Sequence, residues 1–318
     1  MIEPILLVGA GPMAVEYTKV LQALNRPVLV VGRGEKSAAN FQKKTDIPVK
    51  IGGLDAWLEQ ATAIPSTAIV CVGEKWLGQA ARKLIARGVK NILVEKPGGL
   101  DSRDIREVAL AAEANNASVY VGFNRRFFAS TLKAQQIVQE DGGVLSFSFE
   151  FTEWGYVIAD LEKEDGVKEE WFLANSTHVI DHAFFLGGKP KEISCFTAGG
   201  VAWHPRASVY AGAGITEAGA LFSYQANWEA PGRWAVEVMT KKHRLIFKPM
   251  EKLQVQKIGS VTIEEMSIDD ELDRKFKPGL YKEVNSFLSE QKTGLPSIQE
   301  QVALLEYYEQ INGRCTGN

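Results

Sequence analysis

Lys96 is the residue of this chain whose type and setting most favour chemistry. It lies in the tripeptide Glu95-Lys96-Pro97, directly after an apolar run at residues 92–94. A lysine at the carboxyl end of a buried strand can donate to a substrate hydroxyl or exchange its proton, since partial desolvation lowers its pKa. We therefore expect Lys96 to be catalytic. We also expect both Glu95 and Lys96 to contact a cofactor. The alternative is that Lys96 is a solvated lysine in a loop without a catalytic role.

A second group with acid–base character opens a predicted helix in the other half of the chain. His178 and Asp181 are three residues apart, so they lie about one helical turn from each other. The pair can supply a general acid or base with an orienting carboxylate, and the nearby Asn175 can bind substrate. His178 and His182 also have the spacing of a metal pair, but no third ligand is evident and we expect no metal. A buried structural histidine is the other alternative.

A glycine turn stands between the first predicted strand and the first predicted helix. Residues 9–14 read Gly-Ala-Gly-Pro-Met-Ala, which matches the pattern G-x-G-x-x-A of dinucleotide-binding turns. The glycines allow a tight turn and close approach of a pyrophosphate, and the helix N-terminus faces its charge. The predicted cofactor-binding residues here are Gly9, Gly11, Pro12 and Met13. A glycine turn without a ligand is the alternative.

The end of the second predicted strand favours NADP over NAD. Many NAD enzymes place an acid there, on the ribose 2′-hydroxyl, whereas this chain has Gly32. Arg33, Lys36 and Ser37 could bind a 2′-phosphate, Arg33 through its planar guanidinium. Alternatively, Arg33 and Lys36 are surface charges and Glu35 takes the role of the acid.

A basic segment follows the last strand of the first half. Asn124 and Arg125 could bind an anionic or hydroxyl-rich substrate. For Arg126 we favour an ion pair with a carboxylate that fixes the interface between the two halves.

The chain divides into two predicted domains with different hydrophobic patterns. In residues 1–124, short apolar runs at 5–8, 28–31, 68–72, 92–94 and 119–121 alternate with helical patterns at 13–24, 76–87 and 102–115. Asp101 or Ser102 would cap the last helix. This alternation predicts an α/β domain with a doubly wound parallel sheet that binds a dinucleotide.

The second predicted domain, residues 125–318, is α+β with an open, mostly antiparallel sheet that binds substrate and forms oligomers. Alternating patterns at 145–151, 220–228, 234–240 and 244–248 predict strands, and 176–186, 279–291 and 298–311 predict helices. The last two helices could pack back on the first domain. Residues 158–167 and 199–214 are predicted loops over a site.

Composition excludes several classes of protein. The net charge of −3 over 318 residues offers no electrostatic footprint for nucleic acid, and the first apolar run is too short for a membrane span. We expect a cytoplasmic protein without membrane or nucleic-acid partners. The cysteines Cys71, Cys195 and Cys315 are odd in number and widely spaced, which predicts reduced thiols and no zinc site.

Taken together, these motifs resemble one family across the whole chain, the Gfo/Idh/MocA oxidoreductases. Four segments carry the resemblance in this order: Gly9–Ala14, Glu95–Pro97, Gly122–Phe127 and His178–Asp181. The resemblance implies a Rossmann domain, a C-terminal α/β domain whose open sheet builds dimers or tetramers, and hydride transfer between NAD(P) and a hydroxyl or keto carbon of a sugar or nucleotide sugar.

By the same resemblance, Lys96 is the catalytic lysine, His178 the second acid or base, and Asp181 its neighbour. Two departures stand against the family pattern. Ala174 occupies a place where many members have an aspartate, and residues 71–76 lack the usual Thr-Pro.

Two other functions remain compatible with these residues. One is an NAD-dependent glycosidase of the same fold, and the other a non-catalytic NAD(P)-binding sensor or assembly subunit. Four tryptophans in the second half could stack on a sugar ring or a base, or belong to the core: Trp154, Trp171, Trp203 and Trp228.

Overall fold

The structure is a computed structural model that describes residues 2–313. The chain forms two compact units. The first contains residues 2–124 and 274–303, and the second contains residues 125–273 and 304–313. Cys315, predicted to be a reduced thiol, lies outside the described residues.

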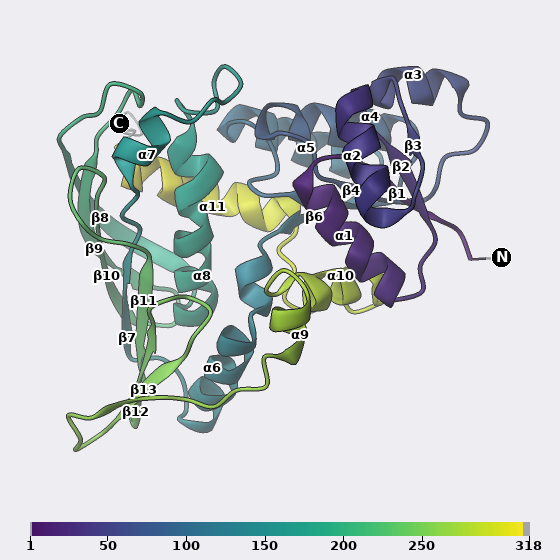
Figure 1. Cartoon of the computed structure of the whole chain (residues 1–318). Helices are drawn as coiled ribbons and strands as arrows, with labels where there is room; N and C mark the ends of the chain where they lie inside the picture. Colours follow the sequence, from purple (N-terminus) through teal and green to yellow (C-terminus); the bar gives the residue numbers. More distant parts are fainter. Residues whose placement is uncertain (1, 314–318) are drawn as a thin grey trace. The chain divides into compact units, whose positions relative to one another are not determined.

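The first unit is built on a six-stranded parallel sheet with the order β3-β2-β1-β4-β5-β6, which is the Rossmann order (Figure 1). Its central strands are buried on both faces, which explains why they read as continuous apolar runs. The strands are β1 (Ile5–Val8), β2 (Val28–Val31), β3 (Val49–Lys50), β4 (Thr67–Val70), β5 (Asn91–Glu95) and β6 (Ser118–Gly122).

Helices of this unit form two packed groups. Helix α1 contacts α2 and α10, and α4 contacts α5. The side chain of Asp101 accepts a hydrogen bond of 2.8 Å from the backbone N–H of Asp104, which confirms Asp101 as the N-cap of α5. The helices are α1 (Pro12–Ala23), α2 (Glu35–Thr45), α3 (Gly53–Gln60), α4 (Leu77–Ala86), α5 (Ser102–Ala114) and α10 (Leu280–Leu288).

The second unit contains an eight-stranded sheet with the order β14-β13-β12-β11-β7-β10-β9-β8. Its neighbours are antiparallel except for β7 and β10, which are parallel, so the predicted mostly antiparallel sheet is confirmed. The strands are β7 (Ser146–Glu150), β8 (Pro190–Ala198), β9 (Val209–Thr216), β10 (Leu221–Asn227), β11 (Ala235–Met239), β12 (His243–Phe247), β13 (Gln254–Lys257) and β14 (Ile263–Glu265).

An aromatic core joins this sheet to α8. Phe184 of α8 packs edge to face on Phe222, with ring centroids 5.3 Å apart, and Phe149 stacks on Tyr224 at 5.3 Å. The remaining helices are α6 (Ala129–Glu140), α7 (Gly155–Ala159), α8 (Thr177–Gly187), α9 (Glu271–Lys275) and α11 (Ile298–Ile311).

The predicted loop over residues 199–214 is wrong for its second half, because β9 occupies Val209–Thr216. Its glycines have a packing reason. A Cβ on Gly212 would collide with the ring of Tyr224, and one on Gly214 would collide with Phe222. The small residues therefore admit the aromatic rings of the neighbouring strand, and Gly- and Ala-rich sequence here belongs to a strand.

No helix within residues 2–313 is long and apolar enough to cross a membrane. Over the same residues, no group of three His, Cys, Asp or Glu side chains has an arrangement that could hold a metal ion.

Candidate functional site

The turn between β1 and α1 has the shape of a phosphate cradle. Gly9 has a φ of 128°, and a Cβ on it would lie 2.7 Å from the carbonyl oxygen of Cys71. A Cβ on Gly11, by contrast, would meet nothing within 4 Å, so open space borders the turn there. Helix α1 begins at Pro12, and no side chain caps its first amides. Such amides bind anions, and the residues of this turn fit a pyrophosphate.

The end of β2 leaves no room for an acidic side chain at residue 32. A Cβ on Gly32 would lie 2.9 Å from both Ala10 Cβ and Val49 Cγ1. The neighbouring Arg33 is exposed, and its guanidinium carbon lies 5.7 Å from the centroid of the Trp76 ring. The indole thus holds a cation beside the end of this strand.

Lys36 and Ser37 lie in the first turn of α2 and are exposed. The hydroxyl of Ser37 donates a hydrogen bond of 2.9 Å to the carbonyl oxygen of Gly34. Because β1, β2 and β5 are parallel, the glycine turn, Arg33 and Lys96 all lie at the carboxyl-end edge of one sheet.

Lys96 follows β5, and the residue before it is part of a buried polar network. The phenol of Tyr17 donates a hydrogen bond of 2.8 Å to Glu95 and lies 3.5 Å from Glu283 Oε2. Burial raises the pKa of Glu95, and burial together with the charge of Glu95 raises the pKa of Glu283 well above its usual range. The side chain of Glu95 is therefore directed into the unit, where it anchors the backbone that carries Lys96.

Asn124 is also directed toward its own unit. Its side-chain amide donates a hydrogen bond of 2.9 Å to the carbonyl oxygen of Pro278, and the residue is 8% exposed. The contact fastens the end of the β6 segment to residues 274–303.

In the second unit, a buried carboxylate organises the start of α8. Asn175 donates to both oxygens of Glu153, at 3.0 and 3.1 Å, and Ser176 donates to Oε1 at 2.9 Å. A π-helical turn at Phe172–Ser176 precedes α8 and brings these two donors to one acceptor. His178 follows one turn later, half-buried, with its ring centroid 5.9 Å from that of Trp234.

Trp234 is the centre of a group of cations. The guanidinium carbons of Arg125 and Arg233 lie over its ring, 4.8 and 4.4 Å from the centroid. Arg233 also lies 4.8 Å from the Trp154 centroid, and its Nη1 is 3.5 Å from Glu153 Oε2. We call Arg125, Glu153, Trp154, Arg233 and Trp234 the Trp234 cluster.

Asp181 forms an ion pair on α8. Its carboxylate, 1% exposed, accepts hydrogen bonds from Arg126 Nε at 2.8 Å and from Nη2 at 2.5 Å. A bidentate pair of this kind is strong and directional. Asp181 thus positions Arg126, and both residues belong to the second unit.

His182 is a buried histidine beside a hydroxyl. Its Nε2 lies 2.8 Å from Thr131 Oγ1, and its ring packs edge to face on Phe247. Burial, with the charges of Arg125 and Arg126, lowers the pKa of His182 to about 3, so the ring is neutral at pH 7.

The tryptophans named from the sequence divide into two kinds. Trp171, Trp203 and Trp228 form one aromatic cluster, with ring centroids 6.3 Å apart between the first two and 5.6 Å between the last two. Trp154 is 46% exposed and stacks on Arg233.

Sequence reasoning missed Tyr17, Glu153, Arg233, Trp234 and Glu283. A weak signal exists for three of them. Glu153 closely follows a strand, Arg233-Trp234 directly precedes one, and polar–aromatic pairs at strand ends are good contact residues for ligands.

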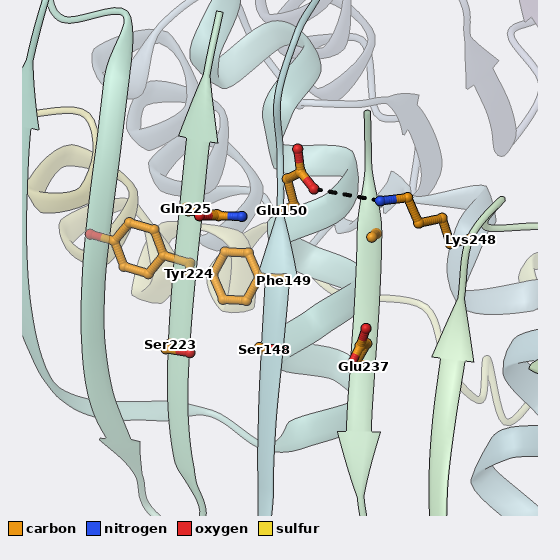
Figure 2. A pocket seen from close by; sticks show the side chains of 9 residues that line it. Ser148, Phe149, Glu150, Ser223, Tyr224, Gln225, Glu237 and Lys248 are labelled. Carbon is orange, nitrogen blue, oxygen red and sulfur yellow. Dashed lines mark ion pairs between the residues drawn. The ribbon is translucent and has the colours of Figure 1, made fainter. Parts of the chain in front are cut away.

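A separate hollow lies over β7, β10 and β11 of the second unit, beside Lys248, which directly follows β12 (Figure 2). Serine, glutamate, glutamine and lysine side chains line much of it, and Lys248 pairs with Glu150 at 3.9 Å. It contains none of the residues predicted from the sequence to bind cofactor or substrate.

Comparison with known proteins finds a family match within the first unit. Residues 4–123 match a family model described as "Oxidoreductase family, NAD-binding Rossmann fold". A human trans-1,2-dihydrobenzene-1,2-diol dehydrogenase is 27% identical over 139 residues, which cover 42% of this chain and 40% of that protein. The match thus spans about two fifths of the curated relative.

Solved structures match over nearly the whole chain. An oxidoreductase from Agrobacterium radiobacter in complex with NAD+, L-tartaric acid and magnesium has a TM-score of 0.78 at 11% identity, covering 100% of this chain and 97% of that one. Levoglucosan dehydrogenase in complex with NADH and L-sorbose has a TM-score of 0.78 at 15% identity, covering 99% and 97%. At these identities the likeness concerns the fold.

Proposed function

We propose that this chain, whose residues 4–123 match the oxidoreductase family model, is a Gfo/Idh/MocA oxidoreductase that transfers a hydride between NAD(P) and a hydroxyl or keto carbon of a sugar or nucleotide sugar. The observation that carries the proposal is the open space at Gly11 on the same sheet edge as Lys96. The match to a sugar-bound dehydrogenase structure supports the substrate class.

The cofactor would be held by the turn at Gly9, Gly11, Pro12 and Met13, with Glu95 and Lys96 at the end of β5. The backbone N–H groups after Gly11 would bind the pyrophosphate. The nicotinamide, when bound, supplies the acceptor or donor of the hydride.

NADP is the favoured form of the cofactor. The steric limit at Gly32 keeps an acid away from the position that NAD enzymes commonly use, and Arg33, Lys36 and Ser37 supply donors for a 2′-phosphate. The contact with Trp76 supports Arg33 in that role, because it already restricts the side chain of Arg33. Less conformational entropy is then lost when a phosphate binds.

Lys96 acts on the reacting oxygen of the substrate. In oxidation, the neutral amine of Lys96, or the ring of His178, takes the proton of the substrate hydroxyl. In reduction, the ammonium of Lys96 donates a proton to the oxygen and stabilises the negative charge that develops on it. The network of Tyr17 and Glu95 holds the lysine's backbone in place, which keeps the ammonium oriented.

In the second unit, Arg125 and Asn175 contribute to substrate binding. Asn124, the last residue of the first unit before this segment, supports the backbone that leads to Arg125. Asn175 would act through Glu153, the acceptor of its amide. Asp181 acts through Arg126, which it holds by two hydrogen bonds. Assembly into a dimer or tetramer stays a prediction.

Turnover of the Lys96→Met variant tests the proposal. Purified protein is given NAD+ or NADP+ with a panel of sugars and nucleotide sugars, and reduced cofactor is followed by its absorbance. We expect turnover to fall by orders of magnitude while cofactor affinity changes by a few-fold at most. Equal turnover of the variant removes Lys96 from the mechanism. Cleavage of glycosides without net absorbance change favours the glycosidase, and ligand binding without reaction favours the sensor.

A further inference from the structure

The Trp234 cluster presents a fixed guanidinium to solvent. Arg233 lies over two indole rings, those of Trp154 and Trp234, at 4.8 and 4.4 Å. Trp154 is itself fixed, because its Nε1 donates a hydrogen bond of 3.0 Å to the carbonyl oxygen of Gly232. The side chain of Arg233 is nevertheless 45% exposed. A planar guanidinium that is stacked but accessible can bind a carboxylate or phosphate through two parallel hydrogen bonds.

The carboxylate of Glu153 leaves much of the hydrogen-bonding capacity of the Arg233 guanidinium unused. Within residues 2–313, Arg233 pairs with Glu153 at 3.5 Å, which is at the outer limit of a hydrogen bond. Glu153 already accepts three shorter hydrogen bonds from Asn175 and Ser176. The pair is therefore weak at Arg233, and an anion of better geometry can bind the same guanidinium.

A second cation increases the attraction for an anion. Arg125 lies over the same indole at 4.8 Å, so two positive charges lie close to one ring. The positive potentials of the two guanidinium groups add, which strengthens the attraction for an anion bound at Arg233. The ring of His178, the proposed acid or base, packs against the same indole at 5.9 Å. An anion bound by this cluster would thus lie near the group that exchanges the proton.

We propose that the substrate of this protein carries an anionic group, a carboxylate or a phosphate, which Arg233 binds with help from Arg125 at the Trp234 cluster. This inference rests on the proposed oxidoreductase function and narrows its substrate class to sugar acids, sugar phosphates or nucleotide sugars. Neutral sugars lack the group that the two arginines recognise.

Calorimetric titration of the full chain with three matched probes tests the inference. The probes are D-glucose, D-glucuronate and α-D-glucose 1-phosphate, which differ in the presence and kind of anionic group. We expect at least one anionic probe to bind tenfold or more tightly than glucose. The anionic probe with the higher affinity shows whether a carboxylate or a phosphate is the preferred group.

Three variants locate the binding. Arg233→Ala should abolish the preference for the anionic probe, and Arg233→Lys should restore only part of it, because an ammonium lacks the planar fork. Arg244→Ala is the matched control. Arg244 pairs with Glu237 on the second unit and is 47% exposed, against 45% for Arg233, so the same charge is lost at similar exposure. The control should keep the preference.

The possible outcomes separate this inference from the proposed function. Equal affinity for glucose and both anions, no binding of either anion, or an unchanged preference in Arg233→Ala overturns the inference. If neutral sugars are oxidised with NAD(P)+ at the same rate in Arg233→Ala, the inference fails while the oxidoreductase function stands. If anions bind through Arg233 and no compound is oxidised, the anion site stands and the proposed function fails. Thermal unfolding of each variant shows that it is folded.

Discussion

The phenol of Tyr17 on α1 donates a hydrogen bond of 2.8 Å to the carboxylate of Glu95, the residue directly before Lys96. The same hydroxyl lies 3.5 Å from Glu283 of α10. Two carboxyl groups therefore converge on one phenol, and one of them belongs to the residue directly before the proposed catalytic lysine. This arrangement couples the stability of the first unit to the position of Lys96.

Replacing Tyr17 by Phe should destabilise the protein and lower its turnover. The change leaves the part-buried carboxyl group of Glu95 and the buried carboxyl group of Glu283 without their shared donor, which costs about 1–3 kcal/mol of unfolding free energy. Urea unfolding measures the loss of stability. A lower kcat at unchanged cofactor affinity would show that Lys96 is affected. Tyr307→Phe is the control, since Tyr307 makes a solvent-exposed hydrogen bond of 3.3 Å to Lys191 in the second unit. Equal stability of the two variants would refute the network's role.

Glu283 should make the protein less stable as the pH rises. Its pKa in the folded state is raised, so above about pH 4.5 the folded state binds more protons than the unfolded state. Unfolding free energy then falls with rising pH, by about 1.4 kcal/mol per pH unit until the raised pKa is reached. Glu283→Gln keeps the shape without the charge and should flatten this slope, as measured by urea unfolding at pH 5 and pH 8. An unaltered slope would show that Glu283 titrates normally.

His182 should weaken the fold in acid. Its pKa is lowered to about 3 from 6.5, so below pH 6.5 the unfolded state binds more protons. The stability held at neutral pH is lost as the pH falls toward 3, by about 1.4 kcal/mol per pH unit. Unfolding of His182→Gln, which can still hydrogen-bond Thr131, should be less sensitive to acid. Identical acid profiles would place the titration elsewhere.

Two glycine substitutions should separate cofactor binding from folding. A Cβ at Gly11 meets nothing within 4 Å, so Gly11→Ala should leave the melting temperature unchanged and weaken cofactor binding. A Cβ at Gly32 lies 2.9 Å from two side chains, so Gly32→Ala should cost about 1–3 kcal/mol of stability. Thermal unfolding and NADPH titration give both quantities. A destabilised Gly11→Ala with normal cofactor affinity would contradict the cradle.

Periodicity predicted the elements whose burial repeats regularly along the chain. β1 and β2 lie at the expected residues, because strands of a parallel sheet are continuous apolar runs. β3 was missed because it has two residues, and α2 because only Ala38, Phe41 and Thr45 of its length are buried. β3 is too short, and α2 has too few buried apolar residues, to give a recognisable hydrophobic period in the sequence.

The contacts around the candidate residues could not be predicted from the sequence. Glu153 and Arg233 are 80 positions apart, and Tyr17 and Glu283 are separated by 266. Such pairs follow from how the strands and helices pack, which local spacing does not specify. The glycine turn could be recognised, because its residues are consecutive and its backbone has a local requirement at Gly9.

The most direct test of the account is a fluorescence titration of the protein, freed of any bound nucleotide, with NADPH and NADH, alongside Arg33→Ala. We expect both nucleotides to bind and NADPH to bind more tightly, with the difference lost in the variant. Equal or tighter binding of NADH would contradict the 2′-phosphate site at Arg33. Binding of neither nucleotide would contradict the central claim that this chain is an NAD(P)-dependent oxidoreductase.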